Sequence, residues 1–290
     1  MKLRALATGA IGFTAALMGV SSTAAVQQLA TAGKRHLTLP SAPPKLSADC
    51  GTKRIPGERF RRPLRALRQA VRTSRPVKVL AIGSSSTAGI GASSYAKAYV
   101  AQLETTLEGA LKGLDVKMIE RGQGGEEAEG AATRMKREIE QDRPDLVVWQ
   151  VGTNDAIGHV SVERFTQCLR TQLKWLKARK IDVVLVDPQY GDELASDAHY
   201  GRVVTAIADV AREARVLLVD RFEAMRETAR QRGEHFYLTA DNLHLNDTGH
   251  RCMAEQLARS IVAGLLSAEA ENASVKAADT VPSPAPEPAP

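Results

Sequence analysis

A serine, a histidine and an aspartate in this 290-residue chain are of the types that together transfer an acyl group from an ester to water. Ser85 lies in the small-residue stretch Gly83–Gly89, where a turn would expose its hydroxyl. His244 follows Asp241 by three residues. A serine hydroxyl is a poor nucleophile until a base removes its proton, and a histidine base must be oriented through its other ring nitrogen. We therefore predict Ser85 as the nucleophile, His244 as the base and Asp241 as the residue that orients the base.

Donors for the negative charge of a tetrahedral intermediate are expected in two further stretches. The glycine-rich stretch Arg121–Glu126 lets a bare backbone N–H approach a ligand, and Gly152–Asp155 carries Asn154. We predict an oxyanion hole made of the N–H groups of Ser85 and Gly125 together with the Asn154 amide. A phosphate-binding loop is the alternative for the glycines, but the GxGxxG spacing and the Lys-Ser/Thr ending of a P-loop are missing.

Two polar side chains near these stretches are candidate substrate contacts. Asp155 and Tyr190, the latter in the run Asp187–Tyr190, are both expected at the ends of strands. An aspartate at such a place often caps the following helix instead, and the tyrosine could equally pack within its own loop. His250 is near enough to His244 in sequence to lie beside the site. The remaining histidines have no metal-ligand spacing, so we predict no metal site: His36, His159, His199 and His235.

The elements that must position these residues alternate between strands and helices. Five short apolar runs rich in β-branched residues predict buried strands: Val77–Ile82, Val116–Ile119, Leu146–Val151, Val183–Val186 and Val216–Val219. The stretches between them repeat apolar residues every third or fourth position, which is typical of helices. This alternation predicts an α/β fold with a mainly parallel sheet and helices on both faces. Ligands bind such sheets at the carboxyl ends of the strands, which is where the candidate residues lie.

The four stretches that carry these residues resemble, in order, the four sequence blocks of the SGNH (GDSL-type) hydrolase family. The resemblance covers about residues 77–265. Gly83–Gly89 is similar to Gly-Asp-Ser-x-x-x-Gly, Gly152–Asp155 to Gly-x-Asn-Asp, and Asp241–His244 to Asp-x-x-His, while the second block's glycine falls on Gly125, with Gly122 and Gly124 as alternatives. The resemblance implies a flavodoxin-like three-layer α/β/α sandwich with a five-stranded sheet. It also implies no metal or organic cofactor, and esterase, lipase, thioesterase or carbohydrate-deacetylase activity.

One residue departs from the family pattern. Ser84 stands where the family usually has an aspartate. A serine hydroxyl can also bond to nearby backbone and brace a turn, so we expect the geometry to survive. The departure leaves Ser84 and Ser86 as alternative nucleophiles.

The charge of the chain is unevenly distributed. The net charge is +6, yet Lys53–Lys78 alone carries ten basic side chains against one acidic one. The rest of the chain beyond residue 78 is acidic, and aromatic residues make up only 4% of the total, so a nucleic-acid partner is not expected. Arg61–Arg72 has apolar residues on one face and is predicted to form a short basic helix. We expect this helix to dock on the acidic domain in preference to a membrane or a glycan; attachment to an anionic cell surface is the alternative.

Composition divides the chain into four parts. Residues 1–25 combine Lys2 and Arg4 with an uncharged apolar stretch and small residues, which is typical of a cleaved export signal; a retained anchor is the alternative. Residues 26–76 are expected to be a Pro- and Arg-rich, poorly structured approach that carries the basic helix. Residues 77–267 are expected to form the hydrolase domain, and residues 268–290 a disordered Pro- and Ala-rich tail. We expect an exported protein, periplasmic or extracellular, without stable membrane insertion after cleavage.

The three cysteines have no CxxC spacing, so a zinc or thioredoxin-like site is not supported. An oxidising compartment permits one disulfide, and the first pair to consider is Cys50 with Cys252. Cys168 lies in a predicted helix, where a buried thiol acts as a small apolar side chain.

These observations favour an exported serine esterase. The segments at the strand ends are short and polar, so they suit a short acyl group, above all acetyl, better than a long acyl chain. The alcohol part of the ester is expected to be a small molecule or a glycan. A lipase, a lysophospholipase or a thioesterase is the alternative within the family. An inactive binding protein on a hydrolase scaffold is the alternative of another class.

Overall fold

The computed structural model of the chain describes residues 39–52, 60, 62–73 and 75–279. The predicted export signal, residues 1–25, lies outside the described residues. In the part of the chain that is described, no helix combines the length and the apolar character needed to cross a membrane.

Five parallel strands form the sheet: β1 (Val77–Gly83), β2 (Val116–Gly122), β3 (Leu146–Gln150), β4 (Asp182–Val186) and β5 (Leu217–Val219). The central strands β1, β3 and β4 are buried along almost their whole length, as required of strands covered on both faces. All five predicted strands are therefore present, with bounds shifted by at most a few residues. The α/β prediction is confirmed.

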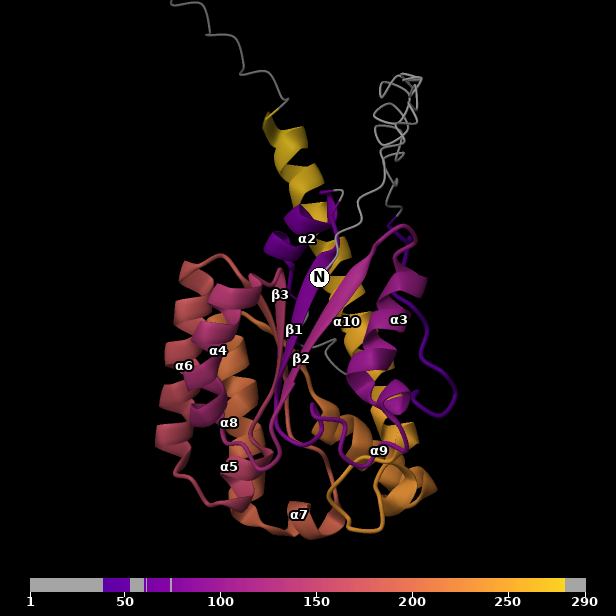
Figure 1. Ribbon diagram of the computed structural model, residues 1–290, viewed down its shortest axis with the longest axis vertical. Helices are drawn as coiled ribbons and strands as arrows, with labels where there is room; N and C mark the ends of the chain where they lie inside the picture. Colours follow the sequence, from indigo (N-terminus) through magenta and orange to yellow (C-terminus); the bar gives the residue numbers. More distant parts are fainter. Residues whose placement is uncertain (1–38, 53–59, 61, 74, 280–290) are drawn as a thin grey trace, which may run out of the picture. The chain divides into compact units, whose positions relative to one another are not determined.

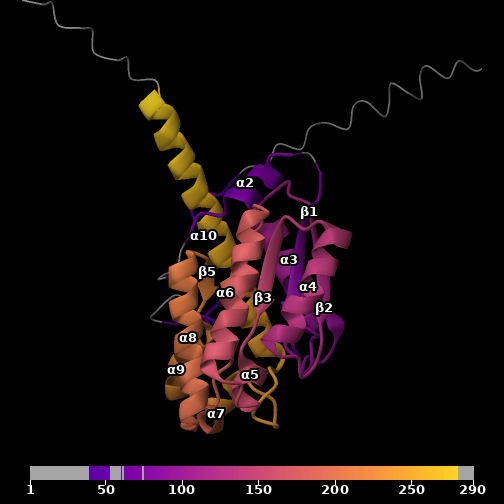
Figure 2. The same cartoon turned by 90° about the vertical axis from the view of Figure 1, so that its left-hand side faces the viewer.

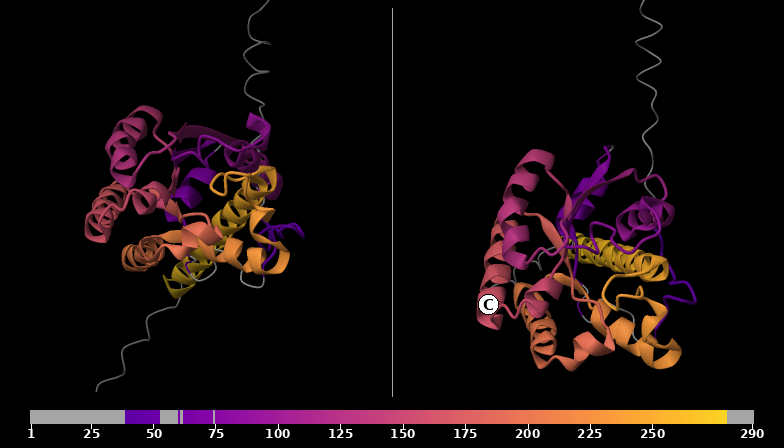
Figure 3. Two further views of the ribbon diagram at one scale, coloured as in Figure 1. Left: turned by 90° about the horizontal axis from the view of Figure 1, so that it is seen from below. Right: turned by 60° about the horizontal axis from the view of Figure 1, so that its bottom comes forward.

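The strand order is β2-β1-β3-β4-β5, which is the flavodoxin-like order. The order reverses between β1 and β3, and the carboxyl ends of strands beside such a reversal are where ligands bind. β1 and β2 end level with each other, because Gly83 pairs with Gly122. Figure 3 views the sheet from this edge.

Helices cover both faces of the sheet (Figures 1 and 2). One face is covered by α4 (Ala128–Asp142), α6 (Val162–Ala178) and α8 (Ala198–Ala214), and the other by α3 (Tyr99–Ala110) and α10 (Asp247–Asp279). Shorter elements are α2 (Arg65–Val71), α5 (Thr153–Ile157), α7 (Asp192–Ser196), α9 (Arg221–Arg232) and the 3₁₀ turns η2 (Tyr95–Lys97) and η3 (Glu234–Phe236). In α6, the apolar residues Phe165, Leu169, Leu173 and Leu176 are all buried, so one face of this helix meets the core.

The last helix extends further than the sequence analysis expected. α10 continues to Asp279, twelve residues past the predicted domain end at residue 267. This part of the chain is rich in alanine and glutamate, which favour helices. Glu269 accepts from Arg68 (2.6 Å) and Arg72 (2.9 Å), and Glu271 accepts from Arg65 (2.8 Å). The boundary of the predicted tail is thus too early, and residues 280–290 lie outside the described residues.

The segment before β1 is also more ordered than expected. Phe60, Leu64 and Leu67 are buried in the core, and α2 is the predicted short basic helix. Its arginines pair with the acidic residues of α10, so the helix docks on the domain as expected. Arg75 forms a further ion pair with Asp145, which precedes β3 (2.6 Å).

A disulfide joins Cys50 to Cys252 of α10, so the predicted pair is confirmed. The two cysteines are 202 residues apart in the chain. Closing a loop of that length lowers the conformational entropy of the unfolded state, which stabilises the fold by about 5 kcal/mol at room temperature. Asp49 beside it accepts from Arg232 (3.0 Å) and Arg251 (2.8 Å). Cys168 is free and half-buried, and burial raises the pKa of its thiol to about 11.

Candidate active site

The turn that follows β1 packs tightly against the end of β2 and against residues 241–245, which we call the base loop because it carries His244. A Cβ added to Gly122 at the end of β2 would lie 2.0 Å from the backbone nitrogen of Ala88. Gly91 has a φ of +95°, and a Cβ there would lie 2.2 Å from the Leu245 carbonyl and 3.1 Å from the Cβ of His244. The glycines therefore allow three predicted blocks to meet at one edge of the sheet.

The three serines of this turn differ in exposure and in their partners. Ser84 is 4% exposed, and its N–H (2.9 Å) and hydroxyl (3.1 Å) both donate to Gln150 Oε1, so it braces the turn as expected. Ser86 is 3% exposed and its hydroxyl accepts from Arg221 (3.4 Å). Ser85 is half-buried, and its hydroxyl has no hydrogen-bond partner within the described residues. Of the three, Ser85 is thus the hydroxyl free to react.

The base loop holds His244 in a single orientation. Its Nδ1 lies 2.6 Å from Asp241 Oδ2, so its Nε2 is the nitrogen left to exchange a proton. Oδ1 of Asp241 accepts from the backbone N–H groups of His244 (2.9 Å) and Leu243 (3.1 Å) and from the Thr239 hydroxyl. Partial burial opposes ionisation of Asp241, but the hydrogen bonds from Thr239, His244 and Leu243 outweigh it and hold the pKa of Asp241 below its ordinary value.

Two of the three predicted oxyanion donors, Gly125 and Asn154, lie on segments that are joined by a hydrogen bond. Asn154 in α5 donates through Nδ2 to the Glu126 carbonyl at 2.9 Å, which fixes the amide and leaves one of its two N–H bonds. Gly125 has a φ of +75° and open space where a Cβ would lie. The backbone N–H groups of Ser85 and Gly125 have no hydrogen-bond acceptor within the described residues. All three predicted donors therefore keep an N–H available.

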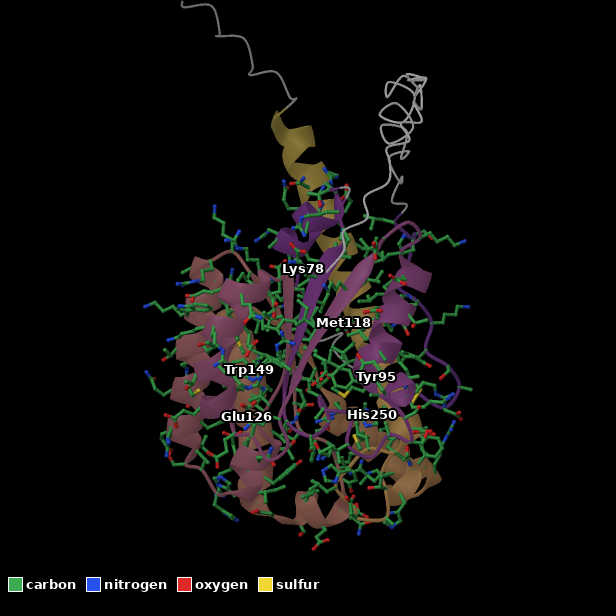
Figure 4. The ribbon with its side chains drawn as sticks, viewed as in Figure 1. Lys78, Tyr95, Met118, Glu126, Trp149 and His250 are labelled. Atoms are coloured by element: carbon green, nitrogen blue, oxygen red, sulfur yellow. A yellow bond between two sulfur atoms is a disulfide. The ribbon has the colours of Figure 1, made fainter. Side chains whose placement is uncertain are left out.

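An ion pair that sequence reasoning missed holds the glycine-rich loop. Arg134 of α4 donates to both oxygens of Glu126 (2.6 Å each) and also to the Arg121 carbonyl (2.6 Å). Both side chains are largely buried. Figure 4 labels Glu126 beside α4. The partners are eight residues apart, across a loop and a helix start, so no short-range pattern announces the pair.

The two candidate substrate contacts are both buried. The carboxylate of Asp155 accepts from the backbone N–H of Ala128 at the start of α4 (3.0 Å), and burial raises its pKa to about 6. The Tyr190 hydroxyl donates to Asp192, and its ring meets Phe222 edge-on at 5.3 Å. These contacts favour the helix-capping alternative for Asp155 and the packed-aromatic alternative for Tyr190.

His250 supports the segment after the nucleophile turn. It is fully buried and lies at 3.2 Å both from the N–H of Tyr99 and from the carbonyl of Ile90. Burial lowers the pKa of His250. A neutral ring that accepts at Nδ1 and donates at Nε2 satisfies both contacts. Among the described residues, no group of three or more His, Cys, Asp or Glu side chains is arranged to hold a metal ion.

Comparisons with known proteins identify the family and the fold. A model of the non-GDSL lipase-like family matches residues 54–267. No curated protein sequence matches the chain.

Several solved structures have a similar fold. A lipase/acylhydrolase from Enterococcus faecalis is 23% identical with a TM-score of 0.56, over 64% of this chain and 95% of the other. An acetylxylan esterase from Geobacillus stearothermophilus is 22% identical with a TM-score of 0.56, over 64% of this chain and 94% of the other. A two-domain esterase active on acetylated mannans is 20% identical with a TM-score of 0.60, over 71% of this chain and 55% of the other.

Proposed function

Since the chain belongs to the non-GDSL lipase-like family, we propose that it is an exported serine esterase that removes short acyl groups, above all acetyl, from a polar alcohol such as a glycan. Membership of this family makes the chain a carboxylic ester hydrolase. The proposal adds the residues that carry the reaction, the substrate class and export. The observation that carries it is the Asp241–His244 pair, which lies against the turn that leaves the Ser85 hydroxyl free.

The reaction proceeds through an acyl-enzyme. Ser85 Oγ attacks the ester carbonyl carbon while His244 Nε2 takes its proton, and the charged oxygen of the tetrahedral intermediate is bound by the N–H groups of Ser85 and Gly125 and by Asn154. Collapse of the intermediate breaks the bond to the alcohol oxygen, which leaves with the proton from His244. Water then attacks the acyl-enzyme, His244 takes a proton from it, and collapse returns that proton to Ser85 and frees the carboxylic acid.

The surface around the site supports a short acyl group. Among the described residues, the exposed large apolar side chains are Ile90, Tyr95 and Ile157, with exposed fractions of 44%, 69% and 45%. Ile90 follows the nucleophile turn and lies next to Gly124, while Ile157 ends α5. Two isoleucines provide a small apolar contact for an acyl group, not a continuous groove. The acetylxylan and acetylated-mannan esterases of similar fold act on acetyl groups of glycans, which suits a polar alcohol here.

A covalent probe tests the nucleophile. An organophosphonate should label the purified protein on Ser85, as located by peptide mass spectrometry, and labelling should vanish in Ser85→Ala but persist in Ser84→Ala. No labelling, together with no hydrolysis of p-nitrophenyl acetate, would identify an inactive binding protein on a hydrolase scaffold.

A series of p-nitrophenyl esters of increasing acyl length tests the substrate class. We expect kcat/KM to be highest for acetate or propionate. A steady rise beyond hexanoate would reveal an acyl groove and favour the lipase, lysophospholipase or thioesterase alternative.

The N-terminal residue of protein recovered outside the cytoplasm tests the export signal, since cleavage after residue 25 would leave Val26 first.

A further inference from the structure

Two buried polar side chains lie between the loops of the candidate site without contributing to the proposed reaction. Gln189 follows β4, and Arg221 is the first residue of α9 after β5. Each is 2% exposed. Burying an amide and a guanidinium is costly unless their hydrogen bonds are satisfied, so their partners show what this placement achieves.

The Gln189 side chain joins the loop after β3 to the base loop. Its Oε1 accepts from the Thr153 hydroxyl (2.9 Å) and from Arg221 Nη2 (3.0 Å). Its Nε2 donates to the Leu243 carbonyl (3.0 Å). The backbone carbonyl of Gln189 accepts from the Tyr200 hydroxyl (2.8 Å), which fixes the residue from behind.

The Arg221 side chain extends the connection to the nucleophile turn. Its Nη1 lies 3.4 Å from Ser86 Oγ, and its Nε donates to the Asp187 carbonyl at 3.0 Å. The guanidinium therefore spans from Gln189 to the residue that follows the nucleophile.

Three of the residues that these side chains contact share one property: each is the immediate chain neighbour of a residue that the mechanism uses. Ser86 follows Ser85, Thr153 precedes Asn154, and Leu243 precedes His244. We propose that Gln189 and Arg221 are positioning residues that set the distances between nucleophile, oxyanion amide and base. The inference rests on the proposed function, which assigns those three roles. Neither side chain touches the reacting atoms; each acts through the neighbouring residue.

The proposal predicts a specific kinetic effect. A displacement of about 1 Å between reacting groups can lower the rate of such a reaction on the order of 10²-fold. Loss of the connection should therefore lower kcat and leave KM nearly unchanged, because the loops lose their relative placement while the substrate contacts remain. A residue with a purely structural role would lower the stability alone.

The experiment compares variants of two equally buried glutamines. Gln189→Met removes every polar contact of that side chain, and Gln189→Glu keeps the acceptor for Thr153 and Arg221 but not the donor to Leu243. Gln172 is also 2% exposed, yet its side chain donates to the sulfur of Met135, so Gln172→Met is the matched control. Arg221→Lys keeps the charge but loses the planar fork that reaches two partners at once. Each variant is assayed with p-nitrophenyl acetate at a temperature where urea unfolding shows it to be folded.

We expect kcat to fall about 10- to 100-fold in Gln189→Met and less in Gln189→Glu and Arg221→Lys, with KM within about twofold of the wild type. Gln172→Met should keep the wild-type kcat. A kcat in Gln189→Met equal to that of Gln172→Met would overturn the proposal, and so would a loss confined to KM. Wild type and Ser85→Ala belong in the same series. An inactive wild type or an active Ser85→Ala overturns the proposed function itself, and with it the positioning role.

Discussion

The sheet has an amino edge, where the strands begin, and a carboxyl edge, where the strands end. These two edges differ in charge and in how completely their polar groups are paired. Every loop that enters a strand carries a cation: Arg72 and Arg75 before β1, Lys112 before β2, Arg143 before β3, Arg179 and Lys180 before β4, and Arg215 before β5. Of the loops that leave the strands, those after β2, β4 and β5 carry the carboxylates Glu126, Glu127, Asp187 and Asp220, and the loop after β1 carries Ser85. Lys78 and Glu126 mark the two edges in Figure 4. Because helices end at one edge and begin at the other, their dipoles favour this division of charge.

The pairing of polar groups separates the edges more sharply than their charge. At the amino edge, the Asp145 carboxylate accepts from both Arg75 guanidinium nitrogens and from the Lys78 backbone N–H. At the carboxyl edge, the Ser85 hydroxyl and the Gly125 N–H have no partner within the described residues. Paired groups stabilise the fold, whereas unpaired groups are available to a substrate. We therefore expect substitutions of the unpaired groups at the carboxyl edge to lower activity and substitutions of the paired groups at the amino edge to lower stability.

The largest expected effect lies within the nucleophile turn. Ser85→Ala should lower kcat for p-nitrophenyl acetate at least about 10⁴-fold, because nucleophile and base act as a unit. Ser84→Ala is the matched control in the same turn and should keep most of the activity, whereas Ser86→Ala also removes the Arg221 contact and should lower kcat far less than Ser85→Ala does. A control variant that is as inactive as Ser85→Ala would transfer the nucleophile to that residue.

The oxyanion amide should give the next largest effect. Asn154→Ala should lower kcat on the order of 10²–10³-fold with KM little changed, the usual loss for one oxyanion donor. Steady-state kinetics with the same ester measure both constants. If KM rises while kcat stays at the wild-type value, Asn154 binds the ground-state substrate and our assignment is wrong.

A pH-dependent cost in stability is expected at Asp155, on the carboxyl edge. Burial raises its pKa to about 6 in the folded protein, from 3.8 when the chain is unfolded. The folded state therefore binds the proton of Asp155 more tightly than the unfolded state does. The stability that this protonation contributes is fully present below about pH 4 and is lost as the pH rises through 6. At about 1.4 kcal/mol per pKa unit, the loss amounts to about 3 kcal/mol.

Asp155→Asn isolates this effect, because every other titrating group is the same in both proteins. Urea unfolding of wild type and variant at pH 4, 5, 6 and 7 should show the wild type losing stability relative to the variant as the pH rises. A difference between the two that is independent of pH would contradict the raised pKa of Asp155.

The smallest expected effect lies at the amino edge. Asp145→Ala leaves the Lys78 N–H and the Arg75 guanidinium without their shared acceptor and should cost about 1–3 kcal/mol of unfolding free energy. Arg75→Ala removes only the half-exposed partner and should cost about 1 kcal/mol or less. Both variants should keep the wild-type kcat. A tenfold loss of kcat in either would show that the edges are not separate.

The sequence predicted the parts of this molecule whose physical signal is local. The strands are short apolar β-branched runs, which only burial on both faces explains, and their order along the chain was enough to place the candidate residues at one edge. The proposed nucleophile, base and amide were found from residue type and spacing over a few positions.

The features that the sequence did not reveal depend on contacts between distant residues. Gln189 contacts Thr153, 36 residues away, and Leu243, 54 residues away. The order of the segment before β1 comes from burial of Phe60 and from the Cys50–Cys252 link. The extension of α10 depends on the arginines of α2, about 200 residues earlier in the chain. No pattern within a short window reports such contacts.

The disulfide makes the covalent chain a closed ring between Cys50 and Cys252. All five strands lie inside this ring, and so do Ser85 and His244, which are thereby connected to each other in both directions along the chain. A single proteolytic cut in any loop of the ring opens it without releasing a fragment. For the exported enzyme that we propose, a nicked molecule would keep nucleophile and base in one covalent unit until the disulfide is reduced.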